Sequence, residues 1–224
     1  MYKGILLDID DTLYQYAPLH NLSSRALFLQ VESSFGIDAE KVESAFSEAK
    51  KIVKQNTPET AASHNRLLYI QSLCEQLKID SLKHSLSLYN IYWDTFLEQL
   101  SLSSGAKVFF DRFGHLPICL VTDLTAHIQH RKIARMGLNK WANYMVTSEE
   151  AGCEKPHPFM FQLALHKLNL SAREVCMIGD NYKKDILGAK RLGIHAYWLT
   201  KENQKINEAG VTCINDLGDI RWEN

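Results

Sequence analysis

The sequence has 224 residues, which is enough for one large domain or for a domain with a smaller insertion. Its apolar fraction of 46% supplies a packed core, and its charged fraction of 23% is ordinary for a soluble protein. The formal net charge of -1 excludes the basic excess of a nucleic-acid-binding domain and the acidic excess of a charged tail.

The cysteines and the apolar runs indicate the compartment. The five cysteines are odd in number, widely spaced and without a C-x-x-C pair, so they do not form the pattern of a disulfide framework. No basic segment followed by an apolar stretch opens the chain, and no apolar run approaches the length of a bilayer. We therefore expect a cytoplasmic protein with neither a nucleic-acid nor a membrane partner.

The first predicted element is a buried strand over residues 2–7. It runs directly into Asp8, Asp10, Asp11 and Thr12, so carboxylates gather at its end. Side chains of a strand alternate with period two, which places Asp8 and Asp10 on the same side. Burying carboxylates costs several kcal/mol unless a cation meets them. The pattern therefore predicts a metal site, a nucleophile, or both.

A helical block follows. Between about residue 21 and residue 100, apolar residues recur at the three- and four-residue spacing of amphipathic helices, as in Val42, Phe46, Ala49 and Val53. Ser23 or Ser63 is expected to cap a helix start, and Gly36 to end the first helix. We predict about four helices here, with hinges around residues 14–20 and 101–105.

The rest of the chain alternates between strand and helix patterns. Strands are predicted over residues 116–121, 144–147, 174–178, 195–199 and 212–214, and helices over residues 126–136, 158–168 and 184–192. Such alternation predicts an α/β fold with a doubly wound parallel sheet. The first strand belongs to this sheet, so the helical block is an insertion. The predicted domains are residues 1–16 with 101–224, and residues 17–100.

Polar side chains follow three of these strands. Thr122 and Asp123 end the second strand, Asp180 ends the strand over 174–178 with Asp185 shortly after it, and Lys155 lies between them. In a doubly wound sheet all of them meet Asp8 and Asp10 at the carboxyl edge, where such sheets bind ligands.

This set of residue types suits phosphoryl transfer. The carboxylates of Asp8, Asp180 and Asp185 are the hard oxygen ligands that Mg²⁺ prefers. Lys155 and Thr122 provide an ammonium and a hydroxyl for a phosphate group. Asp8 is a candidate nucleophile that forms an aspartyl-phosphate, and Asp10 is a candidate acid and base for the leaving oxygen and for water.

Four segments resemble, in order and spacing, the four motifs of the haloacid dehalogenase superfamily of hydrolases: residues 8–12, 121–123, 154–156 and 179–185. The helical block resembles the helical cap that this superfamily inserts between its first two motifs. The resemblance implies a Rossmann-like core with an inserted all-helical cap.

The resemblance also implies individual roles. It makes Asp8 the nucleophile and a metal ligand, and Asp10 the general acid and base and a metal ligand through its backbone carbonyl. Thr122 and Lys155 then hold the phosphoryl group. Asp180 is a ligand of Mg²⁺, and Asp185 supports the metal site through water.

One position departs from the family pattern. Asp123 stands where many relatives have asparagine. Its backbone N–H is expected to bind the phosphoryl group, and the role of its carboxylate stays open.

The rest of the sequence resembles nucleotidases and N-acylneuraminate-9-phosphatases. The resemblance includes the segment that leads from Thr122 to Gln129 and Lys132. We therefore predict a Mg²⁺-dependent phosphomonoesterase, monomeric or a small homo-oligomer, acting on a small phosphorylated metabolite, either a sugar phosphate or a nucleoside monophosphate. A phosphomutase of the β-phosphoglucomutase type, a 2-haloacid dehalogenase and a non-catalytic binding domain are the alternatives. Dehalogenation is disfavoured because a departing halide needs no acid such as Asp10.

Simpler interpretations of these residues compete with the catalytic ones. Asp8 and Asp10 can cap a helix, Lys155 can be a surface lysine, and Asp185 can be a first-turn helix acid. In the helical block, Arg66 is either a substrate contact for a carboxylate or second phosphate, or a solvated residue at a helix start.

Overall fold

The structure is a computed structural model that describes residues 2–200 and 208–222. The chain divides into two compact units, Met1–Gln15 with Ser101–Asn224, and Tyr16–Leu100. We call them the α/β unit and the helical unit. The second unit begins at Tyr16 because its first helix begins there, inside the segment that was predicted as a hinge. That the helical unit acts as a substrate cap stays a prediction.

A parallel sheet of six strands is the centre of the α/β unit in the described part of the chain. Its order is β3-β2-β1-β4-β5-β6, and every neighbouring pair is parallel. The strands are β1 (Gly4–Leu7), β2 (Ile118–Thr122), β3 (Tyr144–Thr147), β4 (Val175–Gly179), β5 (His195–Leu199) and β6 (Val211–Ile214). The order reverses beside β1, so the predicted doubly wound sheet is confirmed and its switch point lies where Asp8 follows β1.

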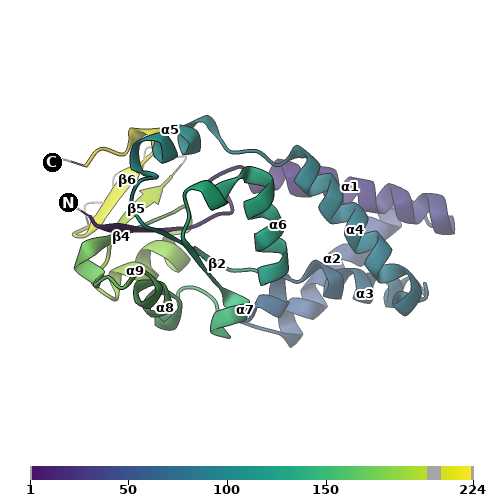
Figure 1. Cartoon of the computed structure of the whole chain (residues 1–224). Helices are drawn as coiled ribbons and strands as arrows, with labels where there is room; N and C mark the ends of the chain where they lie inside the picture. The colour runs from purple at the N-terminus through teal and green to yellow at the C-terminus, as the bar shows by residue number, and fades with distance from the viewer. Residues whose placement is uncertain (1, 201–207, 223–224) are drawn as a thin grey trace. The chain divides into compact units, whose positions relative to one another are not determined.

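Helices cover both faces of this sheet. Figure 1 shows α5 (Ser104–Phe113) on the face opposite to α8 (Pro158–Leu168) and α9 (Leu187–Lys190). Right-handed crossovers place α6 (Ala126–Met136) on the same face as α5, since the chain moves outward from β1 to β3 and then returns to β4. Strands β1, β2 and β4 are buried throughout, as expected for runs of Val, Ile and Leu in a covered parallel sheet.

One local prediction in this unit was wrong, and one helix was not predicted inside a segment expected to be a hinge. The Ser103 side chain accepts a hydrogen bond from the Ala106 N–H and caps α5, while the boundary between the two units lies just before it at Ser101, so the hinge itself stays a prediction. The predicted helix 184–192 instead begins with a π-helical turn, Tyr182–Ile186, capped by Asn181, and continues as α9 only to Lys190. A short helix α7 (Ser148–Ala151) after β3 was also not predicted.

The helical unit contains the expected helices. They are α1 (Tyr16–Phe35), α2 (Ala39–Asn56), α3 (Arg66–Gln76) and α4 (Ser81–Gln99), with a 3-10 turn at Ala61–His64. Helix α1 packs on α4, and α3 packs on both α2 and α4. Within the described residues, no helix of either unit is both long enough and apolar enough to cross a membrane.

The ends of these helices follow from local chemistry. Gly36, with a φ of 66°, ends α1 as predicted. The predicted serine caps were wrong: Ser23 lies inside α1 and donates to the Leu19 carbonyl, and Ser63 lies in the 3-10 turn. Asn65 caps α3 instead, because its side-chain oxygen accepts from the Leu67 N–H at 2.9 Å.

Candidate active site

Three carboxylates meet at the carboxyl edge of the sheet. Asp8 follows β1, Asp180 follows β4, and Asp185 lies in the π-helical turn. Each offers an oxygen atom, and these atoms lie within 4.8 Å of one another. Gly179 permits this approach, because a Cβ atom there would lie 2.4 Å from Oδ2 of Asp185.

Lys155 is the cation of this cluster. It is buried, and its Nζ lies 2.6 Å from Oδ1 of Asp8 and 2.7 Å from Oδ1 of Asp185. It also donates to the Val121 carbonyl at 2.9 Å, which ties it to β2. Burial alone lowers the pKa of Lys155, but the charges of Asp185 and Asp8 outweigh burial and raise it well above its usual value. Lys155 is therefore not the surface lysine of the simpler interpretation.

The cluster holds more negative than positive charge. Burial raises the pKa of Asp8, and although Lys155 lowers it, the charges of Asp185 and Asp180 keep it well above the usual value. Burial and the charges of Asp185 and Asp11 raise the pKa of Asp180 to about 7. A group of oxygen donors that its neighbouring ammonium does not neutralise fits a hard divalent cation such as Mg²⁺.

Thr12 fixes the orientation of the candidate nucleophile. Its hydroxyl donates to Oδ2 of Asp8 at 3.0 Å and lies 3.4 Å from Oδ1 of Asp180. Between them, Asp11 has a φ of 59°, a left-handed conformation that Asp adopts more readily than most residues. The turn after β1 thus folds Thr12 back onto Asp8.

Asp10 has a different set of partners. Its Oδ1 accepts from Nζ of Lys132 at 2.6 Å and from the Tyr14 hydroxyl, and its Oδ2 lies 3.4 Å from Nε2 of Gln129. Burial favours a higher pKa, but the Lys132 charge and these hydrogen bonds outweigh it, so the pKa of Asp10 is lowered. The two acids after β1 therefore have separate cations, Lys155 for Asp8 and Lys132 for Asp10.

Gln129 and Lys132 lie on α6, and sequence reasoning assigned no role to either of them. Both side chains are fully buried, and Nε2 of Gln129 also lies 2.6 Å from Oγ1 of Thr122, which is itself buried at the end of β2. One signature was present: Lys132 is spaced four residues from both Ile128 and Met136, so it lies on the apolar stripe of its helix.

The carboxylate of Asp123, whose role the sequence left open, accepts hydrogen bonds from two other residues of the protein. Its Oδ1 accepts from the backbone N–H of Lys155 at 2.9 Å, and its Oδ2 accepts from Nζ of Lys184 at 2.8 Å. Lys184 also contacts Oε2 of Glu154 at 3.0 Å. Asp123 thus braces the segment that carries Lys155, and Lys184 compensates its charge. Substrate binding by Asp123 stays a prediction for its backbone N–H.

Arg66 belongs to the helical unit, whereas the residues described above belong to the α/β unit. It is buried, and its guanidinium donates to the His64 carbonyl at 2.6 Å and to the Tyr16 hydroxyl. It also stacks against the rings of Tyr16 and Tyr69, with centroid distances of 5.8 and 5.2 Å. It is therefore not the solvated residue of the simpler interpretation, and its role as a substrate contact stays a prediction.

The environment of His20, near Arg66, makes the free energy of unfolding depend on pH. Nδ1 of His20 lies 2.7 Å from the Tyr92 hydroxyl, and burial together with the charges of Arg66 and Lys50 lowers the pKa of His20 to about 4. Above pH of about 6.5 His20 is neutral in both states. As the pH falls towards 4 the unfolded chain takes up a proton that the native protein does not, so stability is lost.

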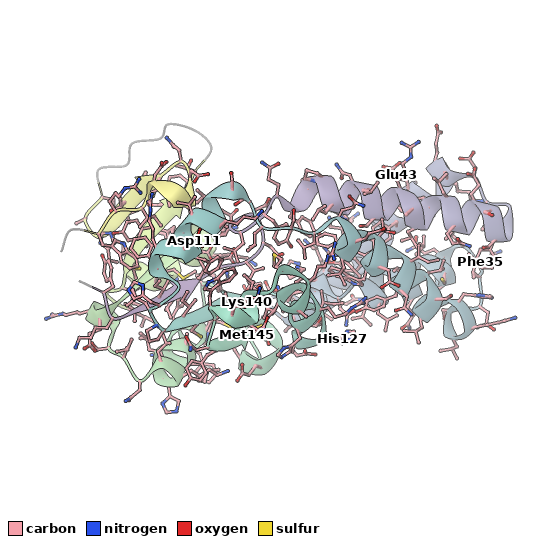
Figure 2. The ribbon with its side chains drawn as sticks, turned by 45° about the horizontal axis from the view of Figure 1, so that its top comes forward. Phe35, Glu43, Asp111, His127, Lys140 and Met145 are labelled. Carbon is pink, nitrogen blue, oxygen red and sulfur yellow. The ribbon has the colours of Figure 1, made fainter. Side chains whose placement is uncertain are left out.

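Urea unfolding followed by circular dichroism at pH 7 and pH 5 tests this. We expect the free energy of unfolding to fall less between pH 7 and pH 5 in His20→Asn than in the wild type. Asparagine can keep the hydrogen bond to Tyr92 but does not titrate. The control His127→Asn, at an exposed position of α6 that is labelled in Figure 2, should match the wild type. Equal pH dependence in all three proteins would contradict the assignment to His20.

Comparison with known proteins gives consistent results. The family model described as haloacid dehalogenase-like hydrolase matches residues 2–193. The chain is 35% identical over 199 residues to ribulose-1,5-bisphosphate 5-phosphatase of Halopiger xanaduensis, covering 87% of this chain and 83% of that protein. It is 29% identical to glyceraldehyde 3-phosphate phosphatase of Pyrococcus abyssi, covering 89% of this chain and 82% of that protein.

A solved structure supports the fold. The crystal structure of 2-haloacid dehalogenase from Pseudomonas syringae pv. tomato matches with a TM-score of 0.76 at 21% identity, over 97% of this chain and 96% of that chain. At this identity the likeness concerns the fold alone.

Proposed function

The chain belongs to the haloacid dehalogenase-like hydrolases, and on that premise we propose that it is a Mg²⁺-dependent phosphatase of small sugar phosphates that works through an aspartyl-phosphate. The observation that carries the proposal is the separation of the two acids after β1. Asp8 contacts Lys155 within the carboxylate cluster, whereas Asp10 contacts Lys132 and Tyr14. One acid is thereby free to act as nucleophile while the other handles protons.

In the proposed first step a carboxylate oxygen of Asp8 attacks phosphorus, and the bond to the ester oxygen of the substrate breaks. Asp10 gives its proton to that leaving oxygen. The pKa of Asp10 is lowered in the substrate-free protein. A bound phosphate dianion raises the pKa of a neighbouring carboxyl, which is the direction that a general acid requires.

In the second step Asp10 removes a proton from a water molecule that attacks the phosphorus of the aspartyl-phosphate. The bond between phosphorus and Asp8 breaks, which regenerates the carboxylate and releases inorganic phosphate. Lys155 and Thr122 hold the phosphoryl oxygens in both steps, together with the backbone N–H of Asp123.

The metal ligands in this proposal are Asp8, Asp180 and the backbone carbonyl of Asp10, with Asp185 as a supporting carboxylate. A Mg²⁺ ion bound there would keep Asp8 ionised and offset the charge of the phosphoryl group. The excess of carboxylate over ammonium charge in the cluster, and the pKa of about 7 for Asp180, support a cation at this place.

The substrate class rests on the named activities of the relatives. These act on ribulose 1,5-bisphosphate and glyceraldehyde 3-phosphate, which are phosphate esters of small sugars. We therefore favour sugar phosphates over nucleoside monophosphates for this chain. Arg66 of the helical unit is kept as a proposed contact for an anionic group of the substrate.

A phosphate-release assay tests the proposal. The purified protein would be given glyceraldehyde 3-phosphate, ribulose 1,5-bisphosphate, glucose 1-phosphate and nucleoside monophosphates, each with Mg²⁺ or with EDTA. We expect Mg²⁺-dependent release of phosphate, fastest with a sugar phosphate. Formation of an isomeric sugar phosphate without phosphate release would instead indicate a phosphomutase. Absence of both reactions across the panel would contradict an enzymatic role.

A further inference from the structure

We propose that Lys132 is a positioning residue that fixes the Asp10 carboxylate for proton transfer, an inference that rests on the proposed function. The first observation is the burial of the pair. The Lys132 side chain is fully buried, whereas the side chain of Asp10 is 30% exposed. A buried lysine is rare unless it is paired, so its partner is built into the fold. The ammonium is the fixed member of this pair, and the carboxylate remains accessible.

The second observation is how donors are distributed over the two oxygens of Asp10. Oδ1 accepts from Lys132 at 2.6 Å and from the Tyr14 hydroxyl. Oδ2 lies 3.4 Å from Nε2 of Gln129, which is long for a hydrogen bond. Because Oδ1 is occupied by two donors, the geometry assigns Oδ2 as the oxygen that exchanges the proton with the leaving group and with water.

The third observation is that α6 supports the acid and the phosphoryl contact together. Gln129 and Lys132 are one helical turn apart, and Nε2 of Gln129 lies 2.6 Å from Oγ1 of Thr122. The ring of Tyr14 lies 5.8 Å from Nζ of Lys132, within the range of a cation–π contact with the ammonium. One rigid helix face thus sets the position of Asp10 relative to Thr122.

The variant Lys132→Met tests the role, because methionine keeps much of the side-chain length but lacks the ammonium. With a sugar phosphate, whose alkoxide leaving group needs a proton, kcat/KM should fall about 100-fold while KM changes less than about 3-fold. With p-nitrophenyl phosphate, whose leaving group departs without a proton, kcat/KM should fall less than about 5-fold. Lys132→Arg should recover part of the loss because it keeps the charge.

Lys167→Met is the matched control, since Lys167 forms an ion pair with Glu150 at 2.6 Å elsewhere in the α/β unit. This variant should leave kcat/KM unchanged with both substrates. Equal losses of kcat/KM with both substrates in Lys132→Met, or no loss with either, would overturn the positioning role.

A crystal structure of Lys132→Met gives a second readout that needs no turnover. We expect the Asp10 carboxylate to move or to occupy several positions, and an unchanged carboxylate would overturn the inference. If the wild-type protein releases no phosphate, the proposed function fails, and this structural comparison still decides whether Lys132 positions Asp10.

Discussion

Replacing Asp8 with asparagine is expected to abolish phosphate release without unfolding the protein. The amide has the shape of the carboxylate but does not attack phosphorus, so turnover should fall by at least about 10⁴-fold. A discontinuous assay of inorganic phosphate, run with the best substrate and saturating Mg²⁺, measures the loss. Retained turnover in Asp8→Asn would contradict the aspartyl-phosphate mechanism.

The same variant has an expected effect on stability. The pKa of Asp8 is raised in the folded protein, chiefly by burial, so its ionisation opposes folding as the pH rises above its ordinary value of about 3.8. Asparagine removes that cost. In EDTA, Asp8→Asn should therefore be at least as stable as the wild type at pH 7, and the difference should shrink towards pH 4.

Asp11→Asn is the matched control for Asp8→Asn. Asp11 lies in the same turn with a φ of 59°, which asparagine also tolerates, and no catalytic role is assigned to it. We expect it to keep most of the activity. A loss in Asp11→Asn as large as that in Asp8→Asn would show that the turn, and not the nucleophile, had been disturbed.

Replacing Lys155 with methionine is expected to remove activity and to destabilise the fold. Lys155 contacts Asp8 and Asp185 at 2.6 and 2.7 Å, and all three side chains are buried. Removing the ammonium leaves two carboxylates without their shared partner, which typically costs about 3–5 kcal/mol of unfolding free energy. Turnover should fall by roughly 10³-fold, since the phosphoryl group loses its protein cation. Urea unfolding in EDTA and the phosphate assay measure the two effects.

Two comparisons separate this effect from a general loss of a lysine. Lys3→Met removes the exposed ion pair with Glu174 and should leave the unfolding midpoint unchanged. Mg²⁺ should raise the melting temperature of Lys155→Met more than that of the wild type, because the variant has a greater excess of negative charge. If Lys155→Met proved as stable as the wild type in EDTA, Lys155 would not be the cation that balances this cluster.

Much of the sheet could be predicted because its strands are locally distinctive. The strand over residues 144–147 and the strand over 195–199 have the predicted bounds, as do the helices over 126–136 and 158–168. Buried parallel strands are continuous apolar runs, and covered helices have an apolar stripe, so short windows of sequence suffice. The strand-end acids were identified for the same reason, since each directly follows such a run.

The sequence was least informative where local composition and tertiary contacts conflict. Helix α5, which was not predicted, begins in a stretch of serine and glycine. Gly105 is needed there because a Cβ atom would lie 2.0 Å from Oδ1 of Asp216, a contact with a residue far along the chain. A glycine that serves a distant packing contact is indistinguishable in sequence from one that serves a flexible turn.

The sequence by itself thus determined the sheet, the inserted helices, the family resemblance and the candidate residues at the strand ends. Only the tertiary structure decided which charges pair. Lys132 meets Asp10 across 122 residues of sequence, and the Asp123 carboxylate meets Lys184 across 61. The local spacing places Lys132 on the apolar stripe of its helix, but burying an unpaired ammonium costs several kcal/mol, and no local pattern names the carboxylate that offsets this cost. Whether a distant carboxylate removes that cost depends on how the chain returns to the same edge of the sheet.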